Sequence, residues 1–310
     1  MEERIVGLVA ERGPQTGAEL REALGEEGFA QWRACVRSDR LAIRRVGRRY
    51  LRLDQRVEGY ARLSPSILRE FLTYSVVGLA DDPAPLEART AALAAHIREI
   101  STAKHRLAER FIDEIGARVA DDGRQREGTK TRVLEDRFCV LLAGDIVYQM
   151  AHDAPRPERS TGRMVRGSDL DLVVITDDDV SPELVKSLDD SIYQQKYRQL
   201  INPSIREEID YTIKPISRLR EQARFDTFRH MVPCKILDEA VHLYGSERLY
   251  RAAKALLVEH GIRERLAALE EEAVRLRDQA ESHLLSRDEK SLSGDELYLF
   301  YTSEESEEFE

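Results

Sequence analysis

The chain has 310 residues, of which 42% are hydrophobic and 34% carry a charge, and its formal net charge is −10. This length and apolar content are enough for two or three folded domains and exclude an intrinsically disordered chain. The negative charge argues against general adhesion to nucleic acids, and three widely separated cysteines support neither a disulfide framework nor a zinc site.

The N-terminal region has the element order of a winged helix-turn-helix. Apolar spacing, interrupted at Gly13-Pro14 and Gly25, predicts three short helices at residues 3–10, 16–24 and 27–36. Two strands follow, at residues 41–45 and 49–53, and we expect them to pair as a hairpin around Val46-Gly47-Arg48. We therefore predict a winged-helix domain over residues 1–80.

Arginine is concentrated in this predicted domain. Between Gln31 and Leu53 there are eight arginines and one acid, Asp39, on a chain that is acidic as a whole. Such a local excess of positive charge is typical of a surface that meets phosphates, although a winged helix can also serve protein contacts or dimerisation. The residues that we expect to contact nucleic acid, RNA or DNA, are Arg33, Arg37, Arg44, Arg45, Arg48 and Arg49.

A helical region is expected between this domain and the next. Residues 63–79 have the apolar pattern of a helix, and Asp81-Asp82-Pro83-Ala84-Pro85 has the composition of a linker. Residues 86–119 are rich in alanine and leucine, which favours one long helix or a helix pair. The polar stretch 121–131 is expected to break it. We assign residues 81–133 to this region.

Residues 134–235 are predicted to form a small mixed β-sheet with flanking helices. A buried strand over 138–143 ends at Gly144-Asp145, and a helix is expected to begin in Ile146–Ala151. Further strands are predicted at residues 170–175 and 209–213, with a helix over 182–200 between them.

Carboxylates interrupt two of these strands. Asp169 and Asp171 are two residues apart and so share one face of a strand, and Asp210 lies near the start of the next strand. Neighbouring carboxylates repel each other unless a cation lies between them. Magnesium binds a few carboxylates together with substrate phosphate oxygens, so the pattern predicts a metal site that holds a nucleotide.

At these residues the chain resembles the polymerase-beta-like nucleotidyltransferases. Ser168-Asp169-Leu170-Asp171 matches that family's Ser-Asp-x-Asp element, and Asp210 in Ile209-Asp210-Tyr211 matches its third acid. The resemblance covers residues 138–214, and residues 236–245 look like the helix that often follows. It implies catalytic residues Asp169, Asp171 and Asp210 that bind two magnesium ions, with manganese as an alternative. A nucleoside triphosphate, such as ATP, would be the substrate.

Two features depart from that family's pattern. Gly144-Asp145 stands where the family has Gly-Ser, and 25 positions separate Gly144 from Asp169. Arginines in this insertion could contact phosphates, or the insertion could be a solvated loop. The residues expected to bind the nucleotide are Gly144, Asp145, Arg166, Gly167 and Ser168.

The C-terminal part is predicted to be helical. We assign residues 236–286 to a helical region and 287–310 to an acidic tail, in which nine acids stand against two basic residues. The tail either solubilises the chain or docks on a basic surface of the same or a partner chain, and the sequence leaves open whether a homo-oligomer forms.

Taken together, the sequence predicts an α+β enzyme that transfers a nucleoside monophosphate to a hydroxyl, with RNA as the expected acceptor. The alternatives are a catalytically decayed nucleic-acid-binding regulator and an enzyme that nucleotidylates a protein or a small molecule. No apolar run reaches the roughly 20 residues that cross a bilayer, and no signal-like segment follows Met1, so we expect a cytoplasmic protein without a membrane partner.

Overall fold

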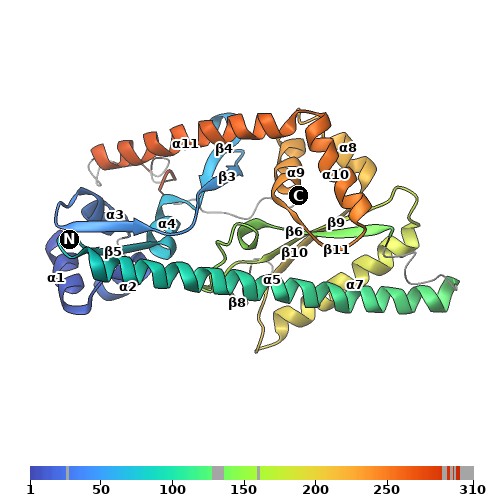
Figure 1. Cartoon of the computed structure of the whole chain (residues 1–310), viewed down its shortest axis with the longest axis horizontal. Helices are drawn as coiled ribbons and strands as arrows, with labels where there is room; N and C mark the ends of the chain where they lie inside the picture. The colour runs from blue at the N-terminus through green and yellow to red at the C-terminus, as the bar shows by residue number, and fades with distance from the viewer. Residues whose placement is uncertain are drawn as a thin grey trace. The chain divides into compact units, whose positions relative to one another are not determined.

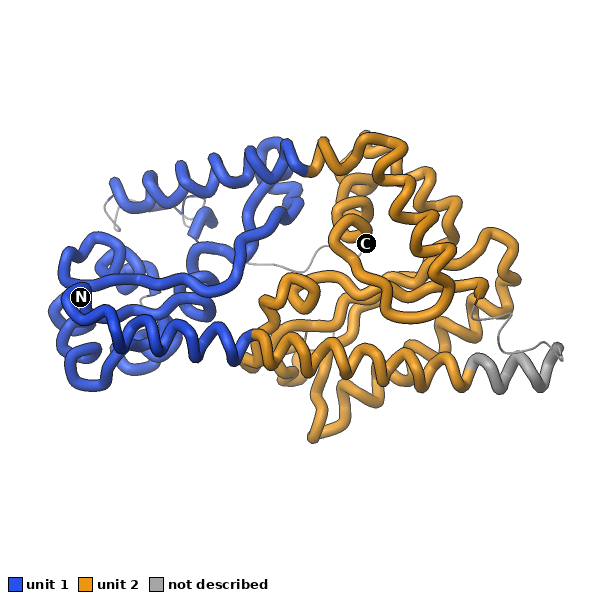
Figure 2. Tube along the Cα trace, viewed as in Figure 1, with its two compact units in different colours: residues 1–97, 267–306 blue, residues 98–266, 307–310 orange. Residues whose placement is uncertain are grey.

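The computed structural model describes residues 1–25, 28–127 (side chains to residue 118), 136–158, 161–287, 292, 293, 296 and 298–300. It is an α+β structure that divides into two compact units (Figure 2). Unit 1 comprises residues 1–97 and 267–306, and unit 2 contains residues 98–266. None of the helices in the described part of the chain is long and apolar enough to cross a membrane.

Unit 1 opens with the three predicted helices, which are confirmed as α1 (Glu2–Arg12), α2 (Gly17–Leu24) and α3 (Gly28–Arg37). Thr16 accepts a hydrogen bond from the Glu19 backbone, and the Glu19 carboxylate accepts one from the Thr16 backbone, so a capping box begins α2. Phe29 and Trp32 of α3 pack with Phe300 in the core of this unit.

A three-stranded antiparallel sheet in unit 1 has the order β1-β5-β2, from β1 (Gln15–Thr16), β5 (Ser75–Leu79) and β2 (Leu41–Arg45). The predicted hairpin is therefore wrong, because β2 pairs with β5 while β3 (Tyr50–Leu53) pairs with β4 (Ala61–Ser64). All four residues of β3 are buried, so this strand does not have one exposed basic face.

The helix predicted over residues 63–79 is also wrong, because only α4 (Ile67–Tyr74) is helical there. Ser66 caps α4 by accepting a hydrogen bond from the Arg69 backbone, and the preceding Pro65 has no N–H to continue a helical ladder. The β-branched pair Val76 and Val77 then enters the centre of the sheet, where both side chains are fully buried.

One long helix follows, so the first of the two predicted alternatives, one long helix or a helix pair, is confirmed. α5 runs from Pro83 to Glu127, and the division between the two units falls within it, after Ile97. Pro83 occupies its first position, where a missing N–H costs nothing, so the predicted linker 81–85 ends in helix. The predicted break at 121–131 does not begin before residue 128, and residues 128–131 lie outside the described part.

Unit 2 is built on a four-stranded sheet of order β10-β9-β6-β11 (Figure 1). β10 and β9 are parallel, and the other two pairs are antiparallel. The predicted strands are confirmed as β6, β9 and β10, and the predicted helix between the last two as α7. The bounds are β6 (Phe138–Ala143), β9 (Leu170–Thr176), β10 (Ile209–Pro215), β11 (Val241–Gly245) and α7 (Pro182–Ile201).

Helices cover both faces of this sheet (Figure 1). Leu170, Leu172 and Val174 of β9 point into a core shared with α5 and α7. The opposite face is covered by α8 (Ile216–Gln222), α9 (Phe228–Glu239) and α10 (Glu247–Glu259). The last helix, α11 (Ile262–Ser286), is predominantly in unit 1.

Two further helix predictions in unit 2 are wrong in part or in whole. The helix predicted over residues 236–245 ends with α9 at Glu239, and residues 241–245 form β11, because Val241 and Leu243 alternate onto the core face and the strand pairs with β6. A helix does not begin in Ile146–Ala151, since the short 3-10 turn Gly144–Ile146 gives way to turns and Gln149 adopts a positive φ of 57°. The insertion before Asp169 contains a hairpin of β7 (Pro155–Pro157) and β8 (Met164–Arg166).

Candidate active site

The three predicted catalytic acids lie at one end of the unit 2 sheet. In the parallel register of β9 and β10, Asp171 is directly opposite Asp210, and Ala143 of β6 flanks Asp171 on its other side. Leu170 and Leu172 point into the core, so Asp171 faces the other side of the sheet. Asp169 immediately precedes β9 and is close enough to Asp210 and Asp145 to interact electrostatically with both.

The turn after β6 holds its backbone against Asp171. Gly144 has φ of 75°, and a Cβ atom at this position would lie 2.1 Å from Asp171 Oδ2. Only glycine fits there without moving the carboxylate. The Gly144 N–H donates to Glu239 Oε1 at 3.2 Å, and the Tyr148 hydroxyl donates to Glu239 Oε2 at 2.5 Å. Glu239 thus joins the end of α9 to this turn.

The two glycine turns are tied together through serine. The Ser168 hydroxyl donates to Asp145 Oδ2 at 3.0 Å, so Asp145 accepts from a neighbour within the site. Gly167 has φ of 62°, and a Cβ there would lie 1.7 Å from the backbone oxygen of His152. The hydrogen bond between Ser168 and Asp145 therefore brings together the two turns, which contain the predicted nucleotide-binding residues Gly144, Asp145, Gly167 and Ser168. The side chain of Arg166, the fifth of these predicted residues, is exposed.

Cationic side chains neutralise the acids. Arg156 of β7 donates through Nε to the Gly167 oxygen at 2.7 Å, and its guanidinium lies 2.6 Å from Glu208 Oε2 and 3.4 Å from Asp169 Oδ2. Lys196 of α7 lies 3.0 Å from Asp210 Oδ1. Four further residues of this site were not predicted from the sequence: Arg156, Glu208, Lys196 and Glu239. The acidic run Glu207-Glu208 beside Asp210 and the arginines of the insertion were the only signals in the sequence.

The electrostatic environment disfavours further negative charge. Burial raises the pKa of Asp169, and the neighbouring Asp210 and Asp145 raise it too, while Arg156 acts in the opposite direction. Burial also raises the pKa of the Glu208 carboxyl against the effect of Arg156. A cation placed among these oxygens would relieve the repulsion.

The donor chemistry fits magnesium or manganese, which prefer carboxylate oxygens. The side-chain positions do not yet form a metal centre, because within the described residues no three His, Cys, Asp or Glu side chains cluster as ligands. Arg156 and Lys196 stand beside two of the acids instead. Binding of a divalent ion by Asp169 and Asp210 would therefore require these two cationic groups to withdraw or to share the carboxylates.

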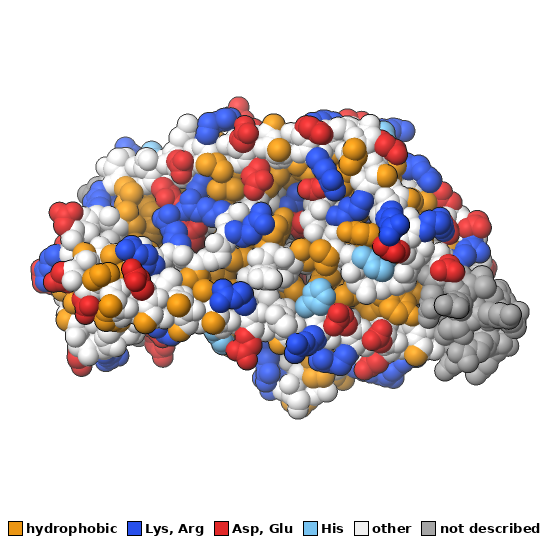
Figure 3. Space-filling view, viewed as in Figure 1, with side chains coloured by type: hydrophobic (Ala, Val, Ile, Leu, Met, Phe, Trp, Pro, Cys, Tyr) orange, Lys and Arg blue, Asp and Glu red, His pale blue; other side chains and the backbone are white. Residues whose placement is uncertain are grey.

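The six arginines predicted to contact nucleic acid have different surroundings within unit 1. Arg33 and Arg37 donate to the backbone oxygens of Arg287 and Leu285. Arg45 and Arg49 both form ion pairs with Glu70 and Glu281. Arg44 and Arg48 are exposed. On the face shown in Figure 3, basic and acidic side chains are interspersed. The positive charge counted along the sequence is therefore balanced in part, at Arg45 and Arg49, by acids distant in sequence.

The buried Lys235–Glu239 pair provides a first prediction. Lys235 Nζ lies 2.6 Å from Glu239 Oε2, and the two side chains are only 6% and 4% exposed. Lys235→Met leaves a buried carboxylate without its counter-ion, and we expect a loss of about 3–5 kcal/mol in the free energy of unfolding, measured by urea denaturation.

A matched control is Lys186→Met, which removes an exposed lysine paired with Asp190, also four residues further along a helix. This variant should leave the unfolding midpoint nearly unchanged. Similar destabilisation in both variants would contradict the importance of burial, and Lys235→Met/Glu239→Met should recover much of the lost stability.

Comparison of the chain with protein-family models, curated proteins and solved structures found no match.

Proposed function

We propose that unit 2 is a polymerase-beta-like nucleotidyltransferase domain that transfers a nucleoside monophosphate from a nucleoside triphosphate to a hydroxyl acceptor. The observation that carries this proposal is the close approach of the Gly144 turn to Asp171, which itself lies in register with Asp210. A phosphate-sized ligand at this turn would lie beside oxygen donors suited to magnesium.

The residues have separate roles in this proposal. Asp169 and Asp171 would hold two magnesium ions, and Asp210 would complete the site at the second strand. Bound magnesium supplies Lewis-acid stabilisation of the charge that develops on the transferred phosphoryl group. Gly144 and Gly167 allow the backbone to approach the ligand closely, and Ser168 orients Asp145 by its hydrogen bond.

For unit 1 we propose a winged-helix domain. The order α1, β1, α2, α3, β2, with β5 between β1 and β2 in the sheet, supports this assignment. The segment between β2 and β5, with its own hairpin and α4, would replace a simple wing. We propose RNA as the acceptor, contacted through the exposed Arg44 and Arg48.

The alternative is a nucleotidyltransferase-like regulator without turnover. The pairing of Arg156 and Lys196 with the acids, and of the Gly144 N–H with Glu239, favours it, because these contacts occupy groups that catalysis would need. The replacement of the family's serine by Asp145 points in the same direction.

Incubation of the purified protein with each α-labelled nucleoside triphosphate tests the proposal. The mixture contains magnesium or manganese, total RNA and cell protein, with Asp169→Ala/Asp171→Ala in parallel. Asp179→Ala removes a 78% exposed acid beyond the other end of β9 and serves as a matched control. We expect label on RNA with the wild type and the control only. Label on protein would identify a protein acceptor, and no transfer by folded wild type would favour the regulator.

A further inference from the structure

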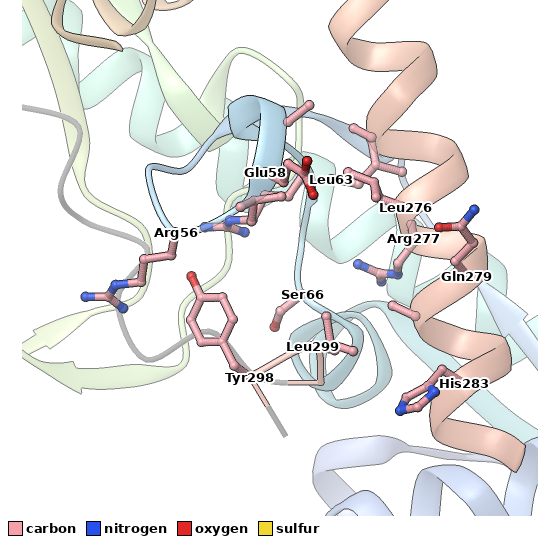
Figure 4. Close-up of a pocket in the computed structure, with 15 residues that line it drawn as sticks. Arg56, Glu58, Leu63, Ser66, Leu276, Arg277, Gln279, His283, Tyr298 and Leu299 are labelled. Carbon is pink, nitrogen blue, oxygen red and sulfur yellow. The ribbon is translucent and has the colours of Figure 1, made fainter. Parts of the chain in front are cut away.

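Unit 1 contains a cavity that the proposed function does not use. It has a volume of about 720 Å³ and lies between the β3–β4 segment, α11 and residues 298 and 299 (Figure 4). This volume falls in the range of sites that bind small molecules. The cavity belongs entirely to unit 1, so it is distinct from the acids of unit 2.

Much of the wall is apolar. Leu63 of β4, Leu276 of α11 and Leu299 face the space from three sides (Figure 4). Ala273 and Ala280 of α11 also line it, and their small side chains leave room next to the helix. Such a wall favours a ligand with a hydrocarbon or aromatic body.

The polar part of the wall is predominantly basic. Three arginines, Arg56, Arg62 and Arg277, line the cavity against one acid, Glu58. Arg62 is paired with Asp54 at 3.0 Å, and the Tyr298 hydroxyl donates to the same carboxylate at 2.5 Å. Arg277 is the buried member of the three, with 7% of its surface exposed.

Arg277 has one guanidinium nitrogen that lies in an ion pair but makes no hydrogen bond with its neighbours. Its Nε donates to Glu281 Oε1 and its Nη1 to the Pro65 oxygen, both at 2.8 Å. Nη2 lies 3.4 Å from Glu70 Oε2, yet it is buried and makes no hydrogen bond within the described structure. Figure 4 shows the guanidinium extending from α11 toward Ser66, on the cavity side of the helix. A buried charged donor of this kind favours an anionic acceptor.

We propose that this cavity binds a small organic anion, a carboxylate, sulfonate or phosphate ester with an apolar body. The body contacts Leu63, Leu276 and Leu299, and the anionic group accepts from Arg277. Glu70 keeps Arg45 and Arg49 as partners when Arg277 turns to a ligand, so the exchange leaves no buried carboxylate without a cation.

Two fluorescent probes with the same aromatic body test this proposal on the full chain. The probes are 1-anilinonaphthalene-8-sulfonate and N-phenyl-1-naphthylamine, which lacks the sulfonate. We expect saturable binding of the sulfonate to the wild type and at least about tenfold weaker binding of the neutral probe, because only the sulfonate can accept a hydrogen bond between charged groups from Arg277.

Paired variants locate the binding site. Leu276→Trp fills the cavity and should weaken the binding of both probes, whereas Val274→Trp introduces the same side chain at an exposed position two residues away and should change the binding of neither. Arg277→Gln should reduce sulfonate binding to the level of the neutral probe, and Arg275→Gln, at an exposed position of the same helix, should not. Thermal unfolding of each variant shows that it remains folded.

Three results would overturn the proposal: no saturable binding of the sulfonate, binding that Leu276→Trp leaves unchanged, or equal affinity for the two probes. The comparison of probes uses only the wild type, so it stands even if Arg277→Gln does not fold. Because the readout is binding in unit 1, failure of this proposal is distinguishable from failure of nucleotidyl transfer.

Discussion

Gly144→Ala is expected to reduce nucleotidyl transfer at least about a hundredfold, because its new methyl group displaces the Asp171 carboxylate, and misplacement by about 1 Å can have an effect of this size. A Cβ at this position would lie 2.1 Å from Asp171 Oδ2 but 3.5 Å from Asp171 Cβ. The carboxylate can therefore rotate away while the strand stays in place. The main effect should fall on activity rather than on folding.

Gly162→Ala is the matched control for this prediction. Gly162 has φ of 67°, close to the 75° of Gly144, but a Cβ there would meet nothing within 4 Å among the described residues. Both variants should lose about 1–2 kcal/mol of stability from the left-handed backbone. Only Gly144→Ala should lose activity. Full activity in Gly144→Ala, or equal loss in the two variants, would contradict the role of the close approach. Single-turnover assays and urea denaturation give the two readouts.

Local patterns in the sequence were sufficient to predict a strand where the segment is buried along its whole length. β6 is a continuous apolar run and β9 contains one from Leu172 to Ile175, and their burial on both faces makes them strands regardless of the details of packing. The alternation in β9 also predicts that Asp169 and Asp171 share a face. Their placement beside Asp210 required only that the strand after α7 be parallel to β9, which a strand, helix, strand order favours.

Local patterns failed where the partner is distant in sequence. β2 pairs with β5 rather than with the nearer β3, because Val76 and Val77 need the central position of the sheet. The ion pair of Arg49 with Glu281 joins residues 232 positions apart, so counting charges between residues 31 and 53 could not reveal it. Glu239 reaches the Gly144 turn for the same reason, through the packing of α9 on β6.

Asp169→Asn is expected to abolish most nucleotidyl transfer without destabilising the chain. Loss of a metal ligand removes several kcal/mol of transition-state stabilisation, which corresponds to a decrease of about a thousandfold in rate. The same substitution removes a charge that the folded state disfavours, because burial, Asp210 and Asp145 raise the pKa of this carboxyl above its ordinary value. Arg156 retains Glu208 as a partner in the variant.

The difference in stability between the wild type and Asp169→Asn is expected to change with pH in one direction. The folded state binds the Asp169 proton more tightly than the unfolded state, so stability falls as pH rises above the unfolded value of 3.8. At neutral pH and with a chelator present, the Asn variant should therefore be at least as stable as the wild type, and this advantage should shrink as pH approaches 3.8.

Asp179→Asn, at an exposed position, should change neither activity nor this pH profile. Retained transfer by Asp169→Asn would exclude Asp169 as a metal ligand. A large loss of stability at neutral pH would show instead that the carboxylate, with Arg156, is structural. An acid that is held in place for metal binding lowers the stability of the metal-free fold. Its replacement is therefore expected to abolish activity while the melting temperature stays unchanged or rises.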